Sequence, residues 1–155
     1  MKIRTTRFGE MDIDPEATIS TPGGLIGFPN EERYVLIRHS PDSPFFWFQA
    51  VDNPDLAFVI IDPALFKPDY QVPLPEALIS ALKADSPEEI SVFVIVTIPR
   101  QDPQTMTANL LGPLVINTQA RLGRQIVLDE RQYSHRHPIM AGGREKTDPA
   151  SPSRK

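Results

Sequence analysis

The stretch VIVTIP at residues 94–99, followed by MTANLLGPLVIN at residues 106–117, decides the fold class. Two apolar runs of strand length, rich in β-branched residues, are joined by a turn-rich connection and an uncharged segment. Neither run places a nucleophile beside a base. A segment this apolar indicates packing or a partner surface rather than a chemical reaction.

Prolines divide the rest of the chain into short apolar runs. There are 17 of them, and a proline inside a helix removes a backbone hydrogen bond, so a long helix is excluded. We therefore predict an all-β fold, a small antiparallel β-barrel-like domain with one or two short helices. The expected strands are residues 3–8, 11–13, 18–20, 34–38, 45–51, 56–61, 92–98, 113–117 and 125–128.

Two of these strands, 56–61 and 92–98, do not alternate between apolar and polar residues, which predicts central strands buried on both faces. The run FFWF at residues 45–48 alternates instead, with Phe45 and Trp47 on one face and Phe46 and Phe48 on the other. One pair belongs to the core. The other pair packs under a loop, which we favour, or forms an exposed apolar patch.

Two short helices are predicted between the strands. The first spans residues 75–83, with Pro75 at the first helical position. The second is a single turn in which Ser86 is the N-cap, Pro87 the first helical residue and Glu89 the end of a capping box. Together they would cover an open edge or end of the sheet.

Composition indicates one domain, residues 1–140. With 155 residues and 40% hydrophobic content, the chain can bury a core without cross-links, and the absence of cysteine excludes a disulfide framework and thiol catalysis. The first residues lack the apolar core of a secretory signal, and no run reaches membrane-spanning length, so we expect a cytoplasmic protein. Residues 141–155 contain no large apolar side chain, which predicts a disordered polar tail.

Charge is distributed unevenly. Residues 42–102 carry ten acidic and three basic side chains, whereas residues 121–155 carry eight basic and four acidic ones. This distribution argues against a wholly basic nucleic-acid binder. The acidic middle either attracts a basic partner or keeps the surface soluble, and both interpretations remain open.

The sequence contains only weak candidates for catalytic or metal-binding motifs. His135 and His137 would share one face of a strand, but His39 is the single further imidazole in the chain, so we favour a surface terminus over a metal site. Asp52 and Asp55 could form a carboxylate pair, but the sequence DNPD is better explained as a turn that Asp52 begins by bonding to the backbone. We expect no cofactor and no enzymatic activity.

Two further features allow a binding role. Asn109 lies between apolar residues, and its amide would satisfy nearby backbone groups or, as the sharper alternative, recognise the main chain of a partner. Basic residues near the C-terminus form either a solvated edge strand, which we favour, or an RNA-binding edge, which would make the protein an RNA-binding β-barrel. They are Arg121, Arg124, Arg131 and Arg136, with Tyr133 among them.

Taken together, motifs along residues 3–138 resemble the FliW family of flagellar assembly factors. The resemblance rests on the order and spacing of short motifs rather than on any one of them. These motifs are TRFG at 6–9, GLIGF at 24–28, PFFWFQ at 44–49, DLAF at 55–58, DP at 62–63, PDY at 68–70, VIVTIP at 94–99, MTANLLGPLVIN at 106–117 and RLGRQIVL at 121–128.

The resemblance implies a non-catalytic β-barrel-like protein of the cytoplasm with two protein partners. It implies binding of newly made flagellin, as a chaperone, and of CsrA, the RNA-binding regulator that represses flagellin translation. When flagellin is scarce, the released factor would sequester CsrA and relieve repression. Because both partners draw on one pool of the factor, binding of one sets the amount available to the other.

From this resemblance we derive two hypotheses about surfaces, and we expect a monomer. CsrA proteins are basic, so acidic residues are the candidates for contact, namely Asp52, Asp55, Asp69, Asp85, Glu88 and Glu89. A disordered segment of flagellin would enter an apolar groove. Its candidate lining residues are Phe46, Phe48, Met106, Asn109 and Leu110.

Overall fold

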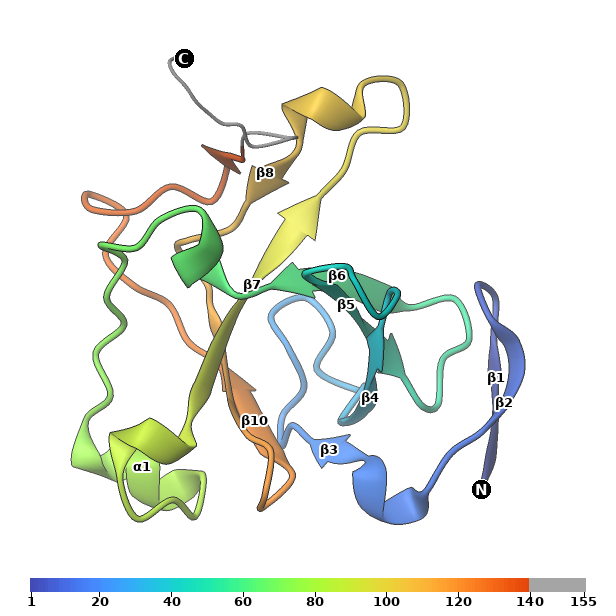
Figure 1. Ribbon diagram of the computed structural model, residues 1–155. Coiled ribbons are helices and arrows are strands. Elements are labelled where there is room, and N and C mark those ends of the chain that lie inside the picture. Colours follow the sequence, from blue (N-terminus) through green and yellow to red (C-terminus); the bar gives the residue numbers. More distant parts are fainter. Residues whose placement is uncertain (140–155) are drawn as a thin grey trace.

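Strand β7 (Ser91–Thr97) organises the fold because it pairs with three other strands. In the computed structural model, which describes residues 1–139, its first half pairs with β9 and its last residues pair with β8. Its other edge pairs with β6. The strand therefore runs from the barrel into a projecting arm, where Figure 1 shows it continuing past the barrel toward β8.

Ten further strands, one α-helix and four short 3-10 helices complete the described chain. The strands are β1 (Lys2–Thr5), β2 (Gly9–Asp12), β3 (Ile19–Ser20), β4 (Arg33–Arg38), β5 (Phe45–Ala50), β6 (Ala57–Ile61), β8 (Thr107–Ala108), β9 (Leu114–Asn117), β10 (Leu122–Gln125) and β11 (His137–Pro138). The helices are η1 (Pro15–Ala17), η2 (Pro63–Leu65), α1 (Glu76–Ala81), η3 (Pro87–Glu89) and η4 (Pro103–Thr105).

Seven strands close into a barrel in the order β3-β4-β5-β6-β7-β9-β10, and β10 returns to β3. Six of the seven pairings are antiparallel, and the closing pair is parallel, with Leu122 opposite Ser20. The predicted all-β barrel with short helices is confirmed. The parallel closure adds a feature that the prediction of an antiparallel barrel did not contain.

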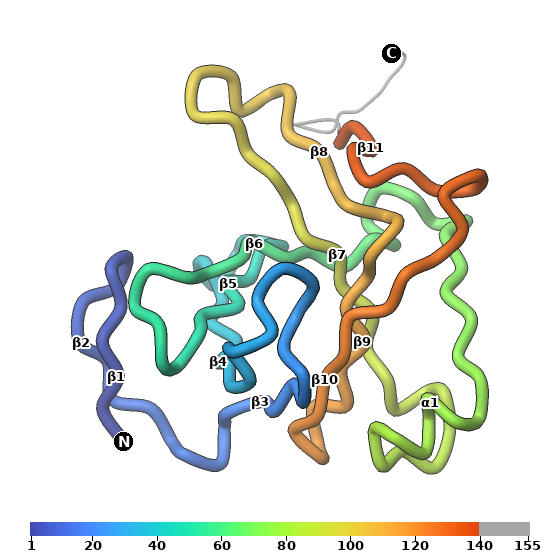
Figure 2. The backbone as a smooth tube through the Cα atoms, turned by 180° about the vertical axis from the view of Figure 1, so that it is seen from behind, coloured from blue at the N-terminus to red at the C-terminus, as the bar shows by residue number. Residues whose placement is uncertain are grey.

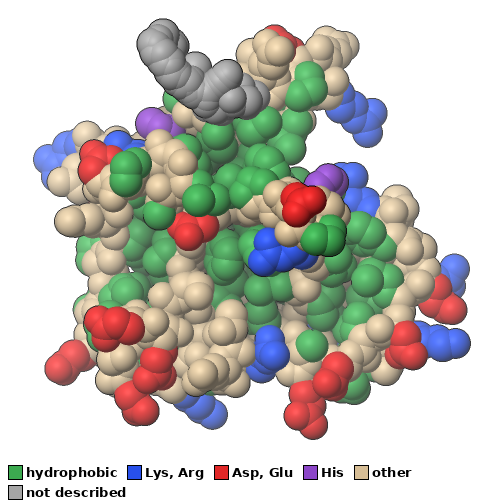
Figure 3. Space-filling model, viewed as in Figure 1, with side chains coloured by type: hydrophobic (Ala, Val, Ile, Leu, Met, Phe, Trp, Pro, Cys, Tyr) green, Lys and Arg blue, Asp and Glu red, His purple; other side chains and the backbone are tan. Residues whose placement is uncertain are grey.

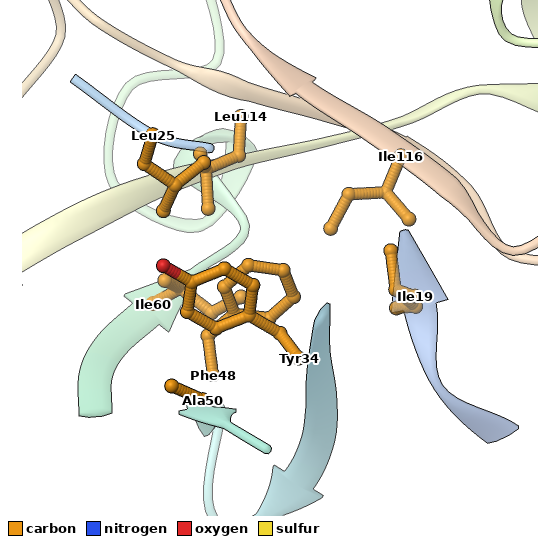
Figure 4. Close-up of a cluster of buried hydrophobic side chains, with 8 residues drawn as sticks. All are labelled: Ile19, Leu25, Tyr34, Phe48, Ala50, Ile60, Leu114 and Ile116. Atoms are coloured by element: carbon orange, nitrogen blue, oxygen red, sulfur yellow. The ribbon is translucent and has the colours of Figure 1, made fainter. Parts of the chain in front are cut away.

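The barrel interior is a continuous apolar core (Figure 4). Tyr34 and Phe48 stack at its centre with ring centroids 4.4 Å apart, and both are fully buried. The Tyr34 hydroxyl has no hydrogen-bond partner among residues 1–139, and burial raises the pKa of this phenol to about 12, helped by the charge of Glu31. Strand alternation places Phe46 and Phe48 on this inner face.

A second apolar core covers the outer face of β6 and β7. Ile61, Val94 and Val96 point outward and pack with Leu110 and Ile139, which arrive from the segments that carry β8 and β11. The two strands are thus packed on both faces, which confirms that they are central. Phe45 packs against this outer core, so each of the two faces of β5 contributes aromatic side chains to packing.

The hairpin of β1 and β2 covers the outer face of β4, where Ile3 packs with Val35 and Val51. Gly9 has φ +69°, the left-handed conformation expected for this turn. The first strand ends at Thr5 rather than Phe8, because Thr5 Oγ1 accepts a hydrogen bond from the Phe8 amide and turns the chain.

Helix α1 and η3 lie at one end of the barrel, where Leu78, Leu82 and Ile90 pack with Val115 of β9. Two details of the predicted helices are wrong. Pro75 is the N-cap of α1 and lies outside its first turn. Glu89 accepts a hydrogen bond from the Asp85 amide, and the Ser86 side chain caps nothing, so the expected capping box is replaced by a wider loop closure.

The last part of the chain departs most from the expected strands. Strand β10 occupies residues 122–125, three residues before the predicted 125–128, because Gly123 lets the strand pack closely on Ile116 and Ile19. Strands β8 and β11 are two residues each, too short for a periodic pattern. The predicted tail, residues 141–155, and the end of the predicted domain at residue 140 lie outside the described residues.

Candidate functional site

An apolar groove crosses the open mouth of the barrel. It consists of three adjoining depressions, of which the middle one, here called the central notch, has a volume of about 360 Å³. The notch shares Phe58 and Ile95 with the depression on one side and Val127 with that on the other. The notch is lined by Leu25, Ile26, Phe58, Ile95, Asn109, Leu111, Gly112, Gln125 and Val127.

One wall of the central notch is the loop between β3 and β4, which passes between β4 and β10 in the view of Figure 2. Gly24 has φ +72°, and a Cβ atom there would lie 2.1 Å from the Phe28 carbonyl oxygen, so this turn requires glycine. Leu25 enters the core while Ile26 points outward with 60% of its surface exposed. The loop therefore buries one apolar residue and presents the next.

Gln125 fixes that wall to the barrel. Its Oε1 accepts a hydrogen bond from the Ile26 amide at 2.9 Å, and its Nε2 donates to the Gly112 carbonyl at 2.9 Å. The two bonded residues Ile26 and Gln125 are 99 positions apart in the chain. Val127, just beyond Gln125, is 65% exposed and completes the rim.

The first end of the groove is basic. This depression, about 630 Å³, lies beside the tip of the β1–β2 hairpin and the projecting end of β7. Arg7 and Arg100 border it together with Trp47 and Ile98, and no carboxylate is among its lining residues. Since burial of apolar surface and charge complementarity both favour protein partners, this end suits an acidic apolar segment.

The second end is larger, about 860 Å³, and more polar than the central notch. It lies between the extended segment at residues 71–73 and the segment at residues 127–133. Tyr133 joins the two, because its hydroxyl donates to the Gln71 carbonyl at 3.3 Å and its ring meets Tyr70 edge to face at 4.9 Å. Asp129 borders this end and pairs with Arg131.

The residues predicted for an apolar groove fall in three different environments. Phe48 and Leu110 are fully buried, in the inner and outer cores respectively, and do not reach the surface in this conformation. Phe46 packs against the inner core and Phe93, and Met106 packs against the outer core. Asn109 is the one predicted residue that lines the central notch.

Asn109 has a structural task as well. Its Oδ1 accepts hydrogen bonds from the Leu111 amide at 3.0 Å and the Gly112 amide at 2.9 Å. These are the hydrogen bonds to nearby backbone groups that the sequence predicts, and they shape the floor of the notch.

The acidic residues predicted to meet CsrA separate into two groups. Asp85, Glu88 and Glu89 lie around η3 and form no ion pair with any residue of the described part of the chain. Figure 3 shows acidic side chains gathered over the end of the molecule that carries α1 in Figure 1. This group is the more available of the two for a basic partner.

The other predicted acids have partners within the protein. Asp52 forms a bidentate pair with Arg33, whose Nη2 lies 2.7 Å from Asp52 Oδ1. Asp55 accepts a hydrogen bond from Thr6, and Asp69 pairs with Lys67, which lowers the pKa of the Asp69 carboxyl. The interpretation of residues 52–55 as a turn holds, but Asn53 rather than Asp52 bonds to the backbone, through the Asp55 amide at 3.2 Å.

The histidines and the basic residues near the C-terminus form no single site. Within residues 1–139, no group of three or more histidine and carboxylate side chains is placed to hold a metal ion. His137 stacks on Phe66 with centroids 5.9 Å apart, and burial lowers its pKa, as does Lys67. Arg121 and Arg124 lie on or beside β10, whereas Arg131 is paired with Asp129, so the predicted RNA-binding set is divided.

Among the described residues, no helix has both the length and the apolar character needed to span a lipid bilayer.

Comparisons with known proteins converge on one family. The model of the family described as FliW protein matches residues 2–139. A flagellar assembly factor FliW of Natranaerobius thermophilus is 40% identical over 139 residues, covering 90% of this chain and 92% of the relative. The FliW of Desulfitobacterium hafniense is 38% identical over 149 residues, covering 96% and 97%.

A solved structure agrees with these sequence matches. The crystal structure of a flagellar assembly factor FliW superposes with a TM-score of 0.82 at 31% identity, covering 90% of this chain and 97% of that one. The barrel described above is therefore shared with that protein.

Proposed function

This chain belongs to the FliW family of flagellar assembly factors, and from that premise we propose that it acts without catalysis, by binding flagellin and CsrA in the cytoplasm. The observation that carries the proposal is the apolar groove at the barrel mouth, whose rim residues Ile26 and Val127 are mostly exposed. Exposed apolar side chains gathered around a depression, rather than scattered singly, are typical of a protein-binding site. Relatives named as assembly factors support a role in association rather than in a reaction.

We assign flagellin to the groove. A segment that is disordered before assembly can lie along an extended apolar depression and bury side chains in it. Of the residues first proposed, Asn109 remains in this assignment, and Ile26, Phe58, Ile95 and Val127 are added.

We assign CsrA to the acidic group around η3. Asp85, Glu88 and Glu89 are exposed and lie around η3, next to Ile90, which packs with Leu78 and Leu82 at this end of the barrel. Binding there would withdraw the regulator from messenger RNA and relieve repression of flagellin synthesis. An acidic group and an apolar groove at different places would also allow one partner to influence the other through the barrel rather than by direct overlap.

Calorimetric titration tests the proposal. The purified protein is titrated with monomeric flagellin and with CsrA from the same organism, each alone and then in sequence. We expect tight binding of both, with one partner weakening the other. Failure to bind either partner would contradict the proposal and favour the alternative of an RNA-binding edge at Arg121 and Arg124, which binding of RNA that weakens steeply with salt would support.

Charge reversal locates the CsrA surface. The double variant Asp85→Lys with Glu88→Lys should lower the association rate with CsrA and the dependence of that rate on salt. The reason is that attraction between acidic and basic surfaces speeds the diffusional encounter of the two proteins. The double variant Asp42→Lys with Glu130→Lys changes the net charge equally at two exposed positions away from η3 and serves as the control. Equal association rates for the two double variants would rule out the group around η3.

A further inference from the structure

Arg7 lies at the basic end of the groove and is held in one orientation. Its guanidinium carbon is 4.3 Å from the centroid of the Trp47 ring, a cation–π contact. The indole is itself fixed, because its Nε1 donates to His39 Nδ1 at 3.2 Å and Phe8 meets it edge to face at 5.9 Å. The guanidinium therefore rests on a rigid surface.

The hairpin tip that carries Arg7 is attached to the barrel. The Thr6 amide donates to the Pro54 carbonyl at 2.9 Å, and the Thr6 hydroxyl donates to Asp55. Thr5 Oγ1 closes the turn by donating to the Gly9 carbonyl at 2.9 Å. Arg7 is thus placed by contacts on both sides of its own position, which reduces the entropy lost when it binds a partner.

No carboxylate of the described chain forms an ion pair with the Arg7 guanidinium. Arg7 and Arg100 form no ion pair with any residue from 1 to 139, whereas Arg33, beyond the groove, is paired with Asp52. The depression that both arginines border has an apolar floor of Phe58, Val59 and Ile95. A planar guanidinium beside apolar surface suits a carboxylate, which it can bind through two parallel hydrogen bonds.

We propose that Arg7 receives a carboxylate of the flagellin segment that occupies the groove, while a large apolar side chain of the same segment fills the central notch. This inference rests on the proposed binding of flagellin and specifies the segment by its chemistry. A base of RNA fits less well at this end, because the Trp47 face on which it would stack is covered by Arg7. The direction of the segment follows, with its acidic residue toward the β1–β2 hairpin.

The test compares three arginine variants by calorimetry with full-length monomeric flagellin. Arg7→Ala should weaken binding about tenfold and reduce its dependence on salt, as expected for loss of a charge-assisted contact. Arg7→Lys keeps the charge but not the planar pair of donors, so it should lie between Arg7→Ala and the unchanged protein. Arg4→Ala removes an exposed arginine of the same hairpin that borders none of the three depressions, and should leave binding unchanged.

A charge swap identifies the partner group. Arg7→Glu should bind unchanged flagellin poorly, and one flagellin variant with a single acidic residue changed to lysine should restore affinity, which a general structural effect of Arg7 would not do. Equal affinity of Arg7→Ala and Arg4→Ala would overturn the inference while leaving flagellin binding established. The inference would also be overturned if Arg7→Ala lost binding of CsrA instead of flagellin, or if the protein formed a dimer that Arg7→Ala abolished. If the protein without any substitution binds no flagellin, the proposed function itself is wrong.

Discussion

Strands β6 and β7 contribute to two apolar surfaces, the outer core and the mouth of the barrel. Other segments of the described chain cover the first surface but not the second. On the outer face, segments around β8, β11 and residues 66–70 cover the strands and leave Leu110 1% exposed and Ile139 7% exposed. At the mouth, no segment of the described chain covers the central notch, and Ile26 and Val127 remain 60% and 65% exposed. The covering segments, and not the strands, thus decide which apolar surface is left for a partner.

Residues that maintain the fold and residues that present a surface are therefore different residues. Covered residues should control the free energy of unfolding and have no direct role in binding. Exposed side chains at the mouth should control binding and contribute little to stability, whereas Gly24, which shapes the loop beneath them, should affect both. The following variants test that division, beginning with the largest expected effect.

Phe48→Ala removes one ring of the central stack with Tyr34. Because the site is fully buried, the loss of contacts and the cavity left behind should lower the free energy of unfolding by about 3–5 kcal/mol. Urea unfolding followed by circular dichroism measures the change. A loss below about 1 kcal/mol would show that Phe48 is not the core residue described here, and would return it to the list of surface candidates.

Gly24→Ala strains the loop that forms the wall of the notch. The new Cβ atom would meet the Phe28 carbonyl and the backbone would keep φ +72°, so we expect a loss of about 1–3 kcal/mol together with weaker flagellin binding. Gly23→Ala is the matched control, because its φ is +82° but nothing lies within 4 Å of a Cβ atom there. The prediction fails if the two variants lose equal stability in the same unfolding experiment.

Tyr70→Phe loosens the outer cover. The Tyr70 hydroxyl donates to the Leu110 carbonyl at 2.6 Å, and loss of this bond should cost about 1 kcal/mol in urea unfolding. Tyr133→Phe, which removes weaker bonds to the Gln71 backbone at 3.3 and 3.4 Å, should cost less. The reverse order would mean that the cover is held at Tyr133 instead.

His137 should give the smallest effect, a dependence of stability on pH. Its pKa in the folded protein is lowered from the ordinary value of 6.5, mainly by burial, so the folded state binds the proton less readily than the unfolded state. The stabilisation is present above pH 6.5 and is lost as the pH falls from there through the lowered pKa. Unfolding curves of His137→Gln should lack this component, while His135→Gln, at an exposed histidine, should retain it.

Local sequence signals predict much of the barrel but not its groove. The β-branched runs of β6, β7 and β9 predict strands, because β-propensity and apolar content can be read from a few neighbouring residues. Alternation also groups Phe46 with Phe48, but it does not show which face of the strand is the inner one, so the sequence alone leaves Phe48 among the candidates for the groove. An interior stack with Tyr34 requires knowledge of how β4 meets β5.

The central notch depends on contacts that no local pattern contains. Ile26 and Gln125 meet across 99 residues of sequence, and Phe58 and Ile95 arrive from two further strands. One signal was available, because Ile26 stands between Leu25 and Gly27 in a glycine-rich loop, where an apolar side chain has little local packing. The acidic residues around η3, by contrast, are near neighbours in the sequence, so the sequence alone places them together.

One matched pair of variants tests whether the uncovered mouth of the barrel is the flagellin-binding surface, as proposed. Val127→Asp changes a rim residue that is 65% exposed, and Leu65→Asp changes a residue of η2 that is 62% exposed but borders none of the three depressions. Calorimetry with flagellin should show affinity at least about tenfold weaker for Val127→Asp and unchanged for Leu65→Asp. Equal affinities for the two variants would contradict the claim.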